Sequence, residues 1–215
     1  MFGVTWQELL LRLPVVLMAI TIHEYAHGYA AYKMGDPTAK FQGRLSMNPL
    51  AHMDLLGALC MILFRFGWAK PVPINPNNFR NRKKGTVIVS LAGPLSNLFL
   101  ALVGAVVCGV LLRVGTYVEG GMFMYALQLI FTQMLVINIS FAVFNIIPVP
   151  PLDGSKILGA ILPSKYYFRF MQYERYGFII LLVLIYTGIL NGILGFLINP
   201  ILDSMLKIIY IIGGI

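Results

Sequence analysis

Between Gly85 and Arg113 the chain reads TVIVSLAGPLSNLFLALVGAVVCGVLL, a run of 27 residues (86–112) without a charged side chain. About 20 apolar residues are enough for a helix to cross the hydrocarbon core of a bilayer. Two further runs, residues 122–147 and 176–202, are free of charge over 26 and 27 residues. The sequence therefore predicts three helices that span a membrane with some tilt.

The composition of the 215-residue chain excludes other classes of protein. Hydrophobic residues make up 59% of the chain and charged residues only 11%, whereas about a quarter of a soluble globular domain is charged. A chain this apolar is also not disordered, because it has much surface to bury. The net charge of +8 is explained by basic residues that hold cytoplasmic loops against anionic lipid. We therefore expect the lipid bilayer, and not nucleic acid, as its surroundings.

A further helix, predicted from about Trp6 to Met34, carries ionisable residues inside its apolar sequence. Residues 23–27 read His-Glu-Tyr-Ala-His, an H-E-x-x-H motif. Residues four apart lie on one face of a helix, so both imidazoles can bind one Zn²⁺, with Glu24 beside them as a general base. Alternatively, the two histidines only form hydrogen bonds between packed helices. That role would not explain why Glu24 lies at membrane depth, where its charge costs at least about 2.5 kcal/mol. We therefore expect His23, Glu24 and His27 to belong to a zinc site.

Catalytic zinc sites commonly have three protein ligands, so a third one is needed. Asp153 is favoured because it ends a segment with three prolines, at positions 148, 150 and 151, directly after the apolar run 122–147. Proline prevents helix, so the chain must leave its helix near Ile147 and run extended to Asp153. Alternatively, Asp153 only caps a helix that begins at Gly154. The other acidic or histidine candidates are Asp36, His52, Asp54, Glu119, Glu174 and Asp203.

The residues between the first two spanning helices form a different kind of region. Residues 35–54 and 67–85 are rich in Gly, Pro and Asn and are predicted to form loops or short strands. The apolar run 55–64 has ten residues, a length that suits a re-entrant or interfacial segment better than a span. We expect His52 and Asp54 to anchor this loop structurally. A second-shell or proton-shuttle role is the alternative for them.

Three motifs together resemble the site-2 proteases, zinc metalloproteases that cleave other proteins within the bilayer. The H-E-x-x-H motif at 23–27 lies in an early membrane helix, residues 93–97 match the GPxxN pattern of the family, and residues 145–154 match its NxxPxxxxDG pattern. Residues 67–76 look like the small bacterial and archaeal branch. Many relatives carry PDZ or CBS modules that select substrates, and we expect neither in this chain.

The resemblance implies a cofactor and a role for each matching residue. By this likeness His23, His27 and Asp153 are ligands of one Zn²⁺ per chain, and Glu24 is the general base. Two asparagines, Asn97 and Asn145, resemble positions in the family that hold or position the unwound substrate. The enzyme is then a zinc-dependent endopeptidase that hydrolyses peptide bonds in transmembrane segments of other membrane proteins.

The expected fold is an all-α polytopic membrane protein with one domain over residues 1–215. It has a three-helix catalytic core over about 6–160, a re-entrant or short-strand region between the first two spanning helices, and one or two C-terminal helices over about 176–215. The apolar tail after Pro200 contains Asp203 and Lys207. Either a short span or an interfacial helix would fit that tail.

The alternative function is that of a membrane metal-ion transporter or carrier that uses the same His, Glu and Asp residues. Transport usually needs repeated halves and ligands on both sides of the membrane, and we find neither in the sequence. Orientation follows from the basic residues of the loops: if 55–64 does not span, thirteen loop Lys and Arg lie on one face, and Arg113 is the only loop one on the other. This predicts a multi-pass protein of the cell membrane, with its N-terminus outside and its active site nearer the cytoplasmic face.

Overall fold

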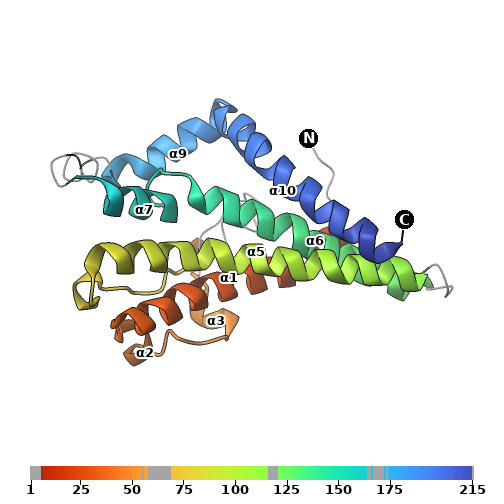
Figure 1. The fold of residues 1–215 in the computed structure, drawn as a ribbon, viewed down its shortest axis with the longest axis horizontal. Helices are drawn as coiled ribbons and strands as arrows, with labels where there is room; N and C mark the ends of the chain where they lie inside the picture. The colour runs from red at the N-terminus through yellow and green to blue at the C-terminus, as the bar shows by residue number, and fades with distance from the viewer. Residues whose placement is uncertain are drawn as a thin grey trace. The chain divides into compact units, whose positions relative to one another are not determined.

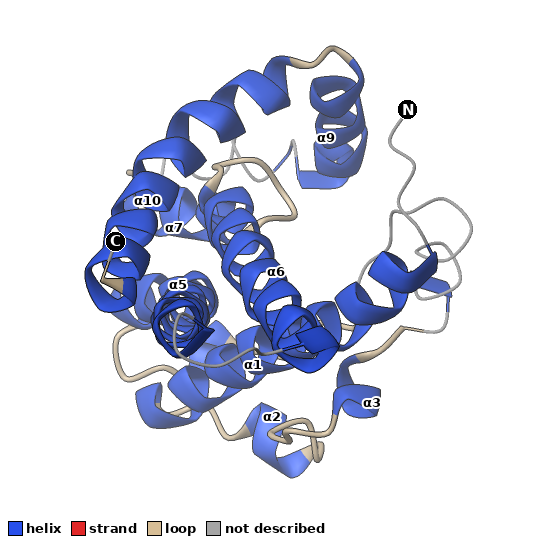
Figure 2. Cartoon of the chain, turned by 90° about the vertical axis from the view of Figure 1, so that its right-hand side faces the viewer, coloured by secondary structure: helices blue, strands red, loops and turns tan. Residues whose placement is uncertain are grey.

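The computed structural model describes residues 6–54, 56–57, 69–115, 121–163, 166, 172 and 174–214. Figure 2 shows helices and loops, and no strand, in this described part. The prediction of an all-α protein is therefore confirmed. The α-helices are labelled in Figure 1. The elements are α1 (Trp6–Met34), α2 (Thr38–Phe41), α3 (Pro49–His52), η1 (Pro76–Asn78), α5 (Arg82–Gly115), α6 (Gly121–Ile146), α7 (Asp153–Ile161), η2 (Glu174–Tyr176), α9 (Gly177–Tyr186) and α10 (Ile189–Gly213).

Three helices of the described part, α5, α6 and α10, are long and apolar enough to cross a membrane. They are consistent with the prediction of a membrane protein. The helix that carries the H-E-x-x-H motif, α1, also has the predicted bounds, from Trp6 to Met34. Its ionisable residues make it less apolar than the other three.

The prediction of one continuous helix over 176–202 is wrong. The structure has α9 up to Tyr186, a turn at Thr187 and Gly188, and then α10. Gly188 adopts φ +74°, a left-handed conformation that glycine reaches without steric cost. Because no charged residue marks this turn, hydropathy alone could not reveal it. The tail after Pro200 is part of α10, which settles its form as the second half of a 25-residue helix.

The loops before α5 are more helical than predicted. Instead of short strands, the described residues contain the single turns α2 and α3, the 3-10 turn η1 and one isolated bridge between Met53 and Ala69. The α3 turn has a local cause, since Asn48 accepts a hydrogen bond from the Leu50 N–H at 3.0 Å. Most of the predicted re-entrant run 55–64 lies outside the described residues, so that prediction stays open.

The chain divides into two compact units, each described here by itself. Unit 1 comprises Met1–Ala19, Asn97–Phe144 and Ile185–Ile215, and unit 2 comprises Ile20–Ser96 and Asn145–Leu184. The prediction of a single domain stays a prediction. In unit 1, small residues of α5 let neighbouring helices approach closely. The buried core there consists of Ala101, Ala105, Cys108, Leu135, Ile139, Val143 and Ile209.

Unit 1 also contains a buried polar link between helices. Asn97 and Asn138 are both 0% exposed. The Asn97 amide donates to the Asn138 side-chain oxygen at 2.8 Å and to the Ala19 carbonyl at 3.2 Å, and the Asn138 amide donates to the Met134 carbonyl at 2.8 Å. These bonds satisfy amides that would otherwise be costly in an apolar interior. They join α1, α5 and α6 at one point.

Replacing Asn138 by alanine should destabilise unit 1. The Asn97 amide then loses one of its acceptors in a buried site, and we expect the free energy of unfolding to fall by about 1–2 kcal/mol. Unfolding of the purified protein in mixed detergent micelles, followed by circular dichroism, measures this. The control is Ser140→Ala on the same helix, whose hydroxyl bonds only to the Val136 carbonyl one turn earlier. Equal losses in the two variants would contradict the assigned role of the asparagine link.

Candidate metal centre

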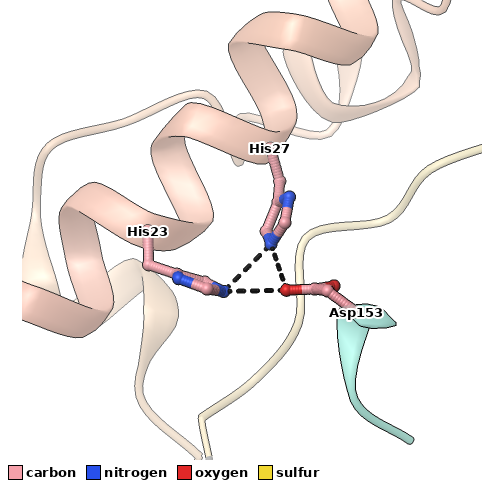
Figure 3. Close-up of side chains that lie close together, drawn as sticks. All are labelled: His23, His27 and Asp153. Carbon is pink, nitrogen blue, oxygen red and sulfur yellow. Dashed lines mark hydrogen bonds and ion pairs between the residues drawn. The ribbon is translucent and has the colours of Figure 1, made fainter. Parts of the chain in front are cut away.

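Three of the side chains singled out in the sequence converge in unit 2. His23 and His27 lie one turn apart on α1, and Asp153 is the first residue of α7. Figure 3 shows both imidazoles and one carboxylate oxygen turned toward a common point. The Asp153 Oδ2 atom is 3.2 Å from His23 Nε2 and 3.0 Å from His27 Nε2, and the two nitrogens are 3.0 Å apart. All three residues are buried, at 8%, 5% and 4% exposure for His23, His27 and Asp153.

The hydrogen bond on the far side of His27 fixes which of its nitrogens carries the proton. Nδ1 lies 2.7 Å from the Val89 carbonyl oxygen, and a carbonyl can only accept, so Nδ1–H is the donor. In the neutral ring, Nε2 then directs a lone pair at the carboxylate oxygen of Asp153, which is also an acceptor. Such an arrangement is typical of a histidine metal ligand whose other ring nitrogen donates to a backbone carbonyl.

The spacing of the three atoms also fits a zinc ion. Ligand atoms at 2.0–2.1 Å from a tetrahedral Zn²⁺ lie about 3.3 Å from one another, close to the 3.0–3.2 Å observed here. A cation placed between the two Nε2 atoms and Oδ2 would be bound by a lone pair of each atom. The donor set is therefore able to hold a metal, with two neutral imidazoles and one charged carboxylate.

Gly93 of α5 provides the space in which the two imidazoles meet. A Cβ atom at this position would overlap His27 Nε2 and would lie 2.6 Å from His23 Nε2. Any other residue at position 93 would thus occupy the space of the ligand nitrogens. The sequence showed this glycine as part of the GPxxN pattern but gave no sign of its contact with the histidines.

Asp153 is held in place by the close approach of neighbouring backbone. A Cβ atom at Gly154 would overlap the Ile146 carbonyl and lie 2.6 Å from the Ile147 carbonyl oxygen, so α7 begins directly against the end of α6. A Cβ atom at Gly177, the first residue of α9, would overlap the Pro150 carbonyl. Sequence reasoning missed Gly177, because nothing in the local pattern links it to a residue 27 positions earlier.

The chain leaves its helix before the prolines, as predicted, but the predicted extended path is wrong, because residues 147–152 form bends and turns, with bonds from the Val149 N–H to the Ile147 carbonyl and from the Leu152 N–H to the Val149 carbonyl. The alternative of a helix cap is wrong as well. The α6 helix ends at Ile146, and α7 begins at Asp153 itself, with Leu152 as its N-cap and no side-chain cap bond. The Asp153 carboxylate instead lies against the two imidazoles through Oδ2 and accepts a hydrogen bond from Lys156 through Oδ1.

Glu24 is held by the main chain of a segment far away in sequence. Its Oε2 atom accepts a hydrogen bond from the Val72 N–H at 2.7 Å. Prolines flank Val72 on both sides, so it carries the one backbone donor of residues 71–73. The Arg44 guanidinium donates to the Lys70 carbonyl at 2.7 Å and thereby fixes the start of this segment. Sequence reasoning missed both contacts.

Asp36, an alternative third ligand in the sequence, has a structural role instead. Its buried carboxylate accepts from the Asn75 N–H and the Asn78 amide, both at 2.7 Å, and from the Thr38 N–H and hydroxyl. Burial by itself would raise the pKa of Asp36, but these bonds outweigh it and lower the pKa below its ordinary value. Asp36 thus links the end of α1 to residues 75–78, which follow Val72 in the chain.

The remaining candidates lie in other surroundings. His52 Nε2 donates to the Ser46 carbonyl at 2.8 Å, and Asp54 accepts from the Gly57 N–H at 2.8 Å, which agrees with the predicted loop-anchoring role. Asn97 belongs to the asparagine link of unit 1, and Asn145 lies near the end of α6. Their predicted contact with substrate stays a prediction. Glu119 lies outside the described residues.

Comparison with known proteins gives a consistent result. The family model described as "Peptidase family M50" matches residues 12–187. A Bacillus subtilis (strain 168) protein named "Putative zinc metalloprotease YwhC" is 38% identical over 193 residues, covering 90% of this chain and 88% of that protein. The Methanocaldococcus jannaschii protein named "Zinc metalloprotease MJ0392" is 27% identical over 156 residues, 71% of this chain and 34% of that protein. No solved structure matches the chain.

Replacing Gly93 by alanine should remove the metal from an otherwise folded protein. The added methyl group would occupy the space of the ligand nitrogens, so we expect zinc content to fall at least about tenfold, the lower end of the effect of disturbing ligand geometry. Elemental analysis of the purified variant measures this. The control, Gly115→Ala, is on the same helix at a position where a Cβ meets nothing within 4 Å, and it should keep its zinc. Full zinc in Gly93→Ala would refute the packing argument.

Proposed function

The chain belongs to peptidase family M50, and on that premise we propose that His23, His27 and Asp153 hold its catalytic zinc and that Glu24 is its general base. The protein is a zinc metalloprotease of the intramembrane-cleaving, site-2 type. The observation that supports the ligand set is the meeting of two Nε2 atoms and one Oδ2 atom within 3.2 Å of one another.

The family argues against the transporter alternative. The family model is that of a peptidase, and the relatives at 38% and 27% identity carry protease names. No observation on the described residues favours a transport path over a hydrolytic site.

The chemistry divides between the metal and the residues of the chain. A bound zinc acts as a Lewis acid on the scissile carbonyl and makes water a better nucleophile. The imidazoles of His23 and His27 stay neutral to bind it, and the Asp153 carboxylate offsets part of its charge. Because Oε2 of Glu24 is held by the Val72 N–H, its other oxygen can accept a proton from the attacking water and donate it to the leaving amine.

We propose a transmembrane segment of another protein as the substrate. Carbonyls in a membrane helix are hydrogen-bonded internally, so the helix must unwind near the cleaved bond, and Gly, Pro or Asn there should help. The freed backbone then needs new partners, and Asn145 and Asn97 are the proposed ones. For Asn97 this requires its amide to exchange the Asn138 oxygen or the Ala19 carbonyl for a substrate group.

We also propose that the site lies nearer the cytoplasmic face of the cell membrane. The α1 helix ends at Met34, and His27 and His23 precede that end by 7 and 11 residues, or about 10 and 16 Å. The loops that follow α1 and precede α5 are rich in Lys and Arg, whereas the other end of α5 carries Arg113. Positive charge marks the cytoplasmic side of membrane proteins.

Two substitutions separate the ligand role from the general-base role. Wild-type protein should bind about one zinc per chain and cleave a model transmembrane substrate in proteoliposomes. Glu24→Gln should keep zinc and lose cleavage by about 10²–10⁴-fold, because it lacks only the proton acceptor. Asp153→Ala should lose zinc and activity together, since it removes a coordinate bond and a charge. Full zinc and substantial activity in Asp153→Ala would place the third ligand elsewhere, with Asp54 and His52 next in line.

The orientation can be tested with single cysteines in a chain from which Cys60 and Cys108 have been removed. Cysteines at Thr38 and Ile161 should react with a membrane-impermeant thiol reagent only after the inner face is opened, whereas one at Met122 should react in intact cells. Labelling of Thr38 from outside without labelling of Ile161 would mean that residues 55–64 span the membrane. That result would overturn the re-entrant arrangement.

A further inference from the structure

The two carboxylate oxygens of Asp153 have different partners. Oδ2 faces His23 and His27, while Oδ1 accepts a hydrogen bond from the Lys156 ammonium at 3.1 Å. Figure 3 shows the second oxygen turned away from the two imidazoles. The Asp153 side chain is 6% exposed, whereas that of Lys156 is 54% exposed. The buried Asp153 carboxylate thus faces the candidate metal centre with one oxygen and the exposed Lys156 ammonium with the other.

The positions of the two residues on α7 favour this pairing. They are three residues apart, which places them on the same face of the helix. An aspartate in the first turn of a helix would otherwise tend to turn toward the unpaired N–H groups there. The Lys156 ammonium offers Oδ1 a charged partner on the opposite side from the imidazoles, so Oδ2 stays directed at them.

We propose that Lys156 is a positioning residue that makes Asp153 a one-oxygen ligand of the metal, an inference that rests on the proposed role of Asp153. A carboxylate can bind a metal through one oxygen or through both. With Oδ1 bonded to an ammonium, two-oxygen binding would require that bond to break. The metal then keeps a coordination position for water or substrate, as a catalytic site needs.

The hydrogen bond from Lys156 to Asp153 also affects how much electron density Asp153 donates to the metal. An ammonium on Oδ1 draws electron density from the carboxylate, so Oδ2 is a weaker donor than a free aspartate would be. A metal with weaker donors remains a stronger Lewis acid. An exposed ion pair is usually worth little for stability, which means that loss of Lys156 should affect the metal site and leave the fold intact.

The test uses purified full-length protein with Lys156→Met, which removes the ammonium and keeps a similar stem, and Lys156→Arg, which restores a cation. Zinc affinity is measured by competition with a chromophoric chelator, and ligand geometry by the visible absorption of the Co²⁺-loaded protein. We expect Lys156→Met to bind zinc several-fold more tightly, because the freed Oδ1 can join Oδ2 on the metal and a nearby positive charge is lost, and to show the weaker Co²⁺ absorption of a site with more ligands. Lys156→Arg should resemble wild type. The control, Lys83→Met, removes an exposed lysine from the first turn of α5 and should change neither.

The outcomes distinguish this inference from the proposed metal centre. Zinc affinity and Co²⁺ absorption unchanged in Lys156→Met, while Asp153→Ala loses zinc, would overturn the role of Lys156 alone. Zinc binding by Asp153→Ala as tight as in wild type would overturn the ligand assignment and this inference together. A loss of affinity in Lys156→Met without any spectral change, and without rescue by arginine, would also refute the one-oxygen role.

Discussion

The close meeting of three polar atoms is the constraint on which the rest of unit 2 depends. Two imidazole nitrogens and a carboxylate oxygen lie within 3.2 Å of one another in a buried place, an arrangement that a shared proton or a bound cation makes favourable. The surrounding residues hold these three atoms together. The α1 helix spaces the histidines, the Val89 carbonyl orients one ring, and Gly93 leaves room for both. The end of α6 fixes the start of α7 and hence Asp153.

Much of this arrangement could be predicted from the sequence, because its signals are local. The four-residue spacing of His23 and His27 is a property of one helix, and the prolines before Asp153 exclude helix over a short stretch. The hydropathy pattern likewise predicted the spans α5 and α6. It failed at Gly188, where the chain turns without any change of polarity. The contacts of Gly93, Val72 and Gly177 join segments far apart in sequence, so no local pattern could have indicated them.

The two units satisfy buried polar groups in different ways. In unit 1, Asn97 and Asn138 bond to each other and to main-chain carbonyls, and no charge is involved. In unit 2, the Asp36 carboxylate accepts several bonds from the segment that also supplies the Val72 N–H to Glu24. The proposed general base, Glu24, and the structural anchor, Asp36, are therefore bonded to the same short segment of the chain, residues 72–78.

The bond between Glu24 and the Val72 main chain has a consequence for how this enzyme would respond to mutation. Every amino acid except proline supplies the same N–H, so a scan of side chains across residues 70–75 would leave the donor intact. Changes at Val72 would act through its packing near Gly28 and not through the proton acceptor. Side-chain substitutions therefore cannot test the hydrogen bond that holds Glu24. A change in the backbone at position 72, such as proline or an ester in place of the amide, would remove the donor and test it.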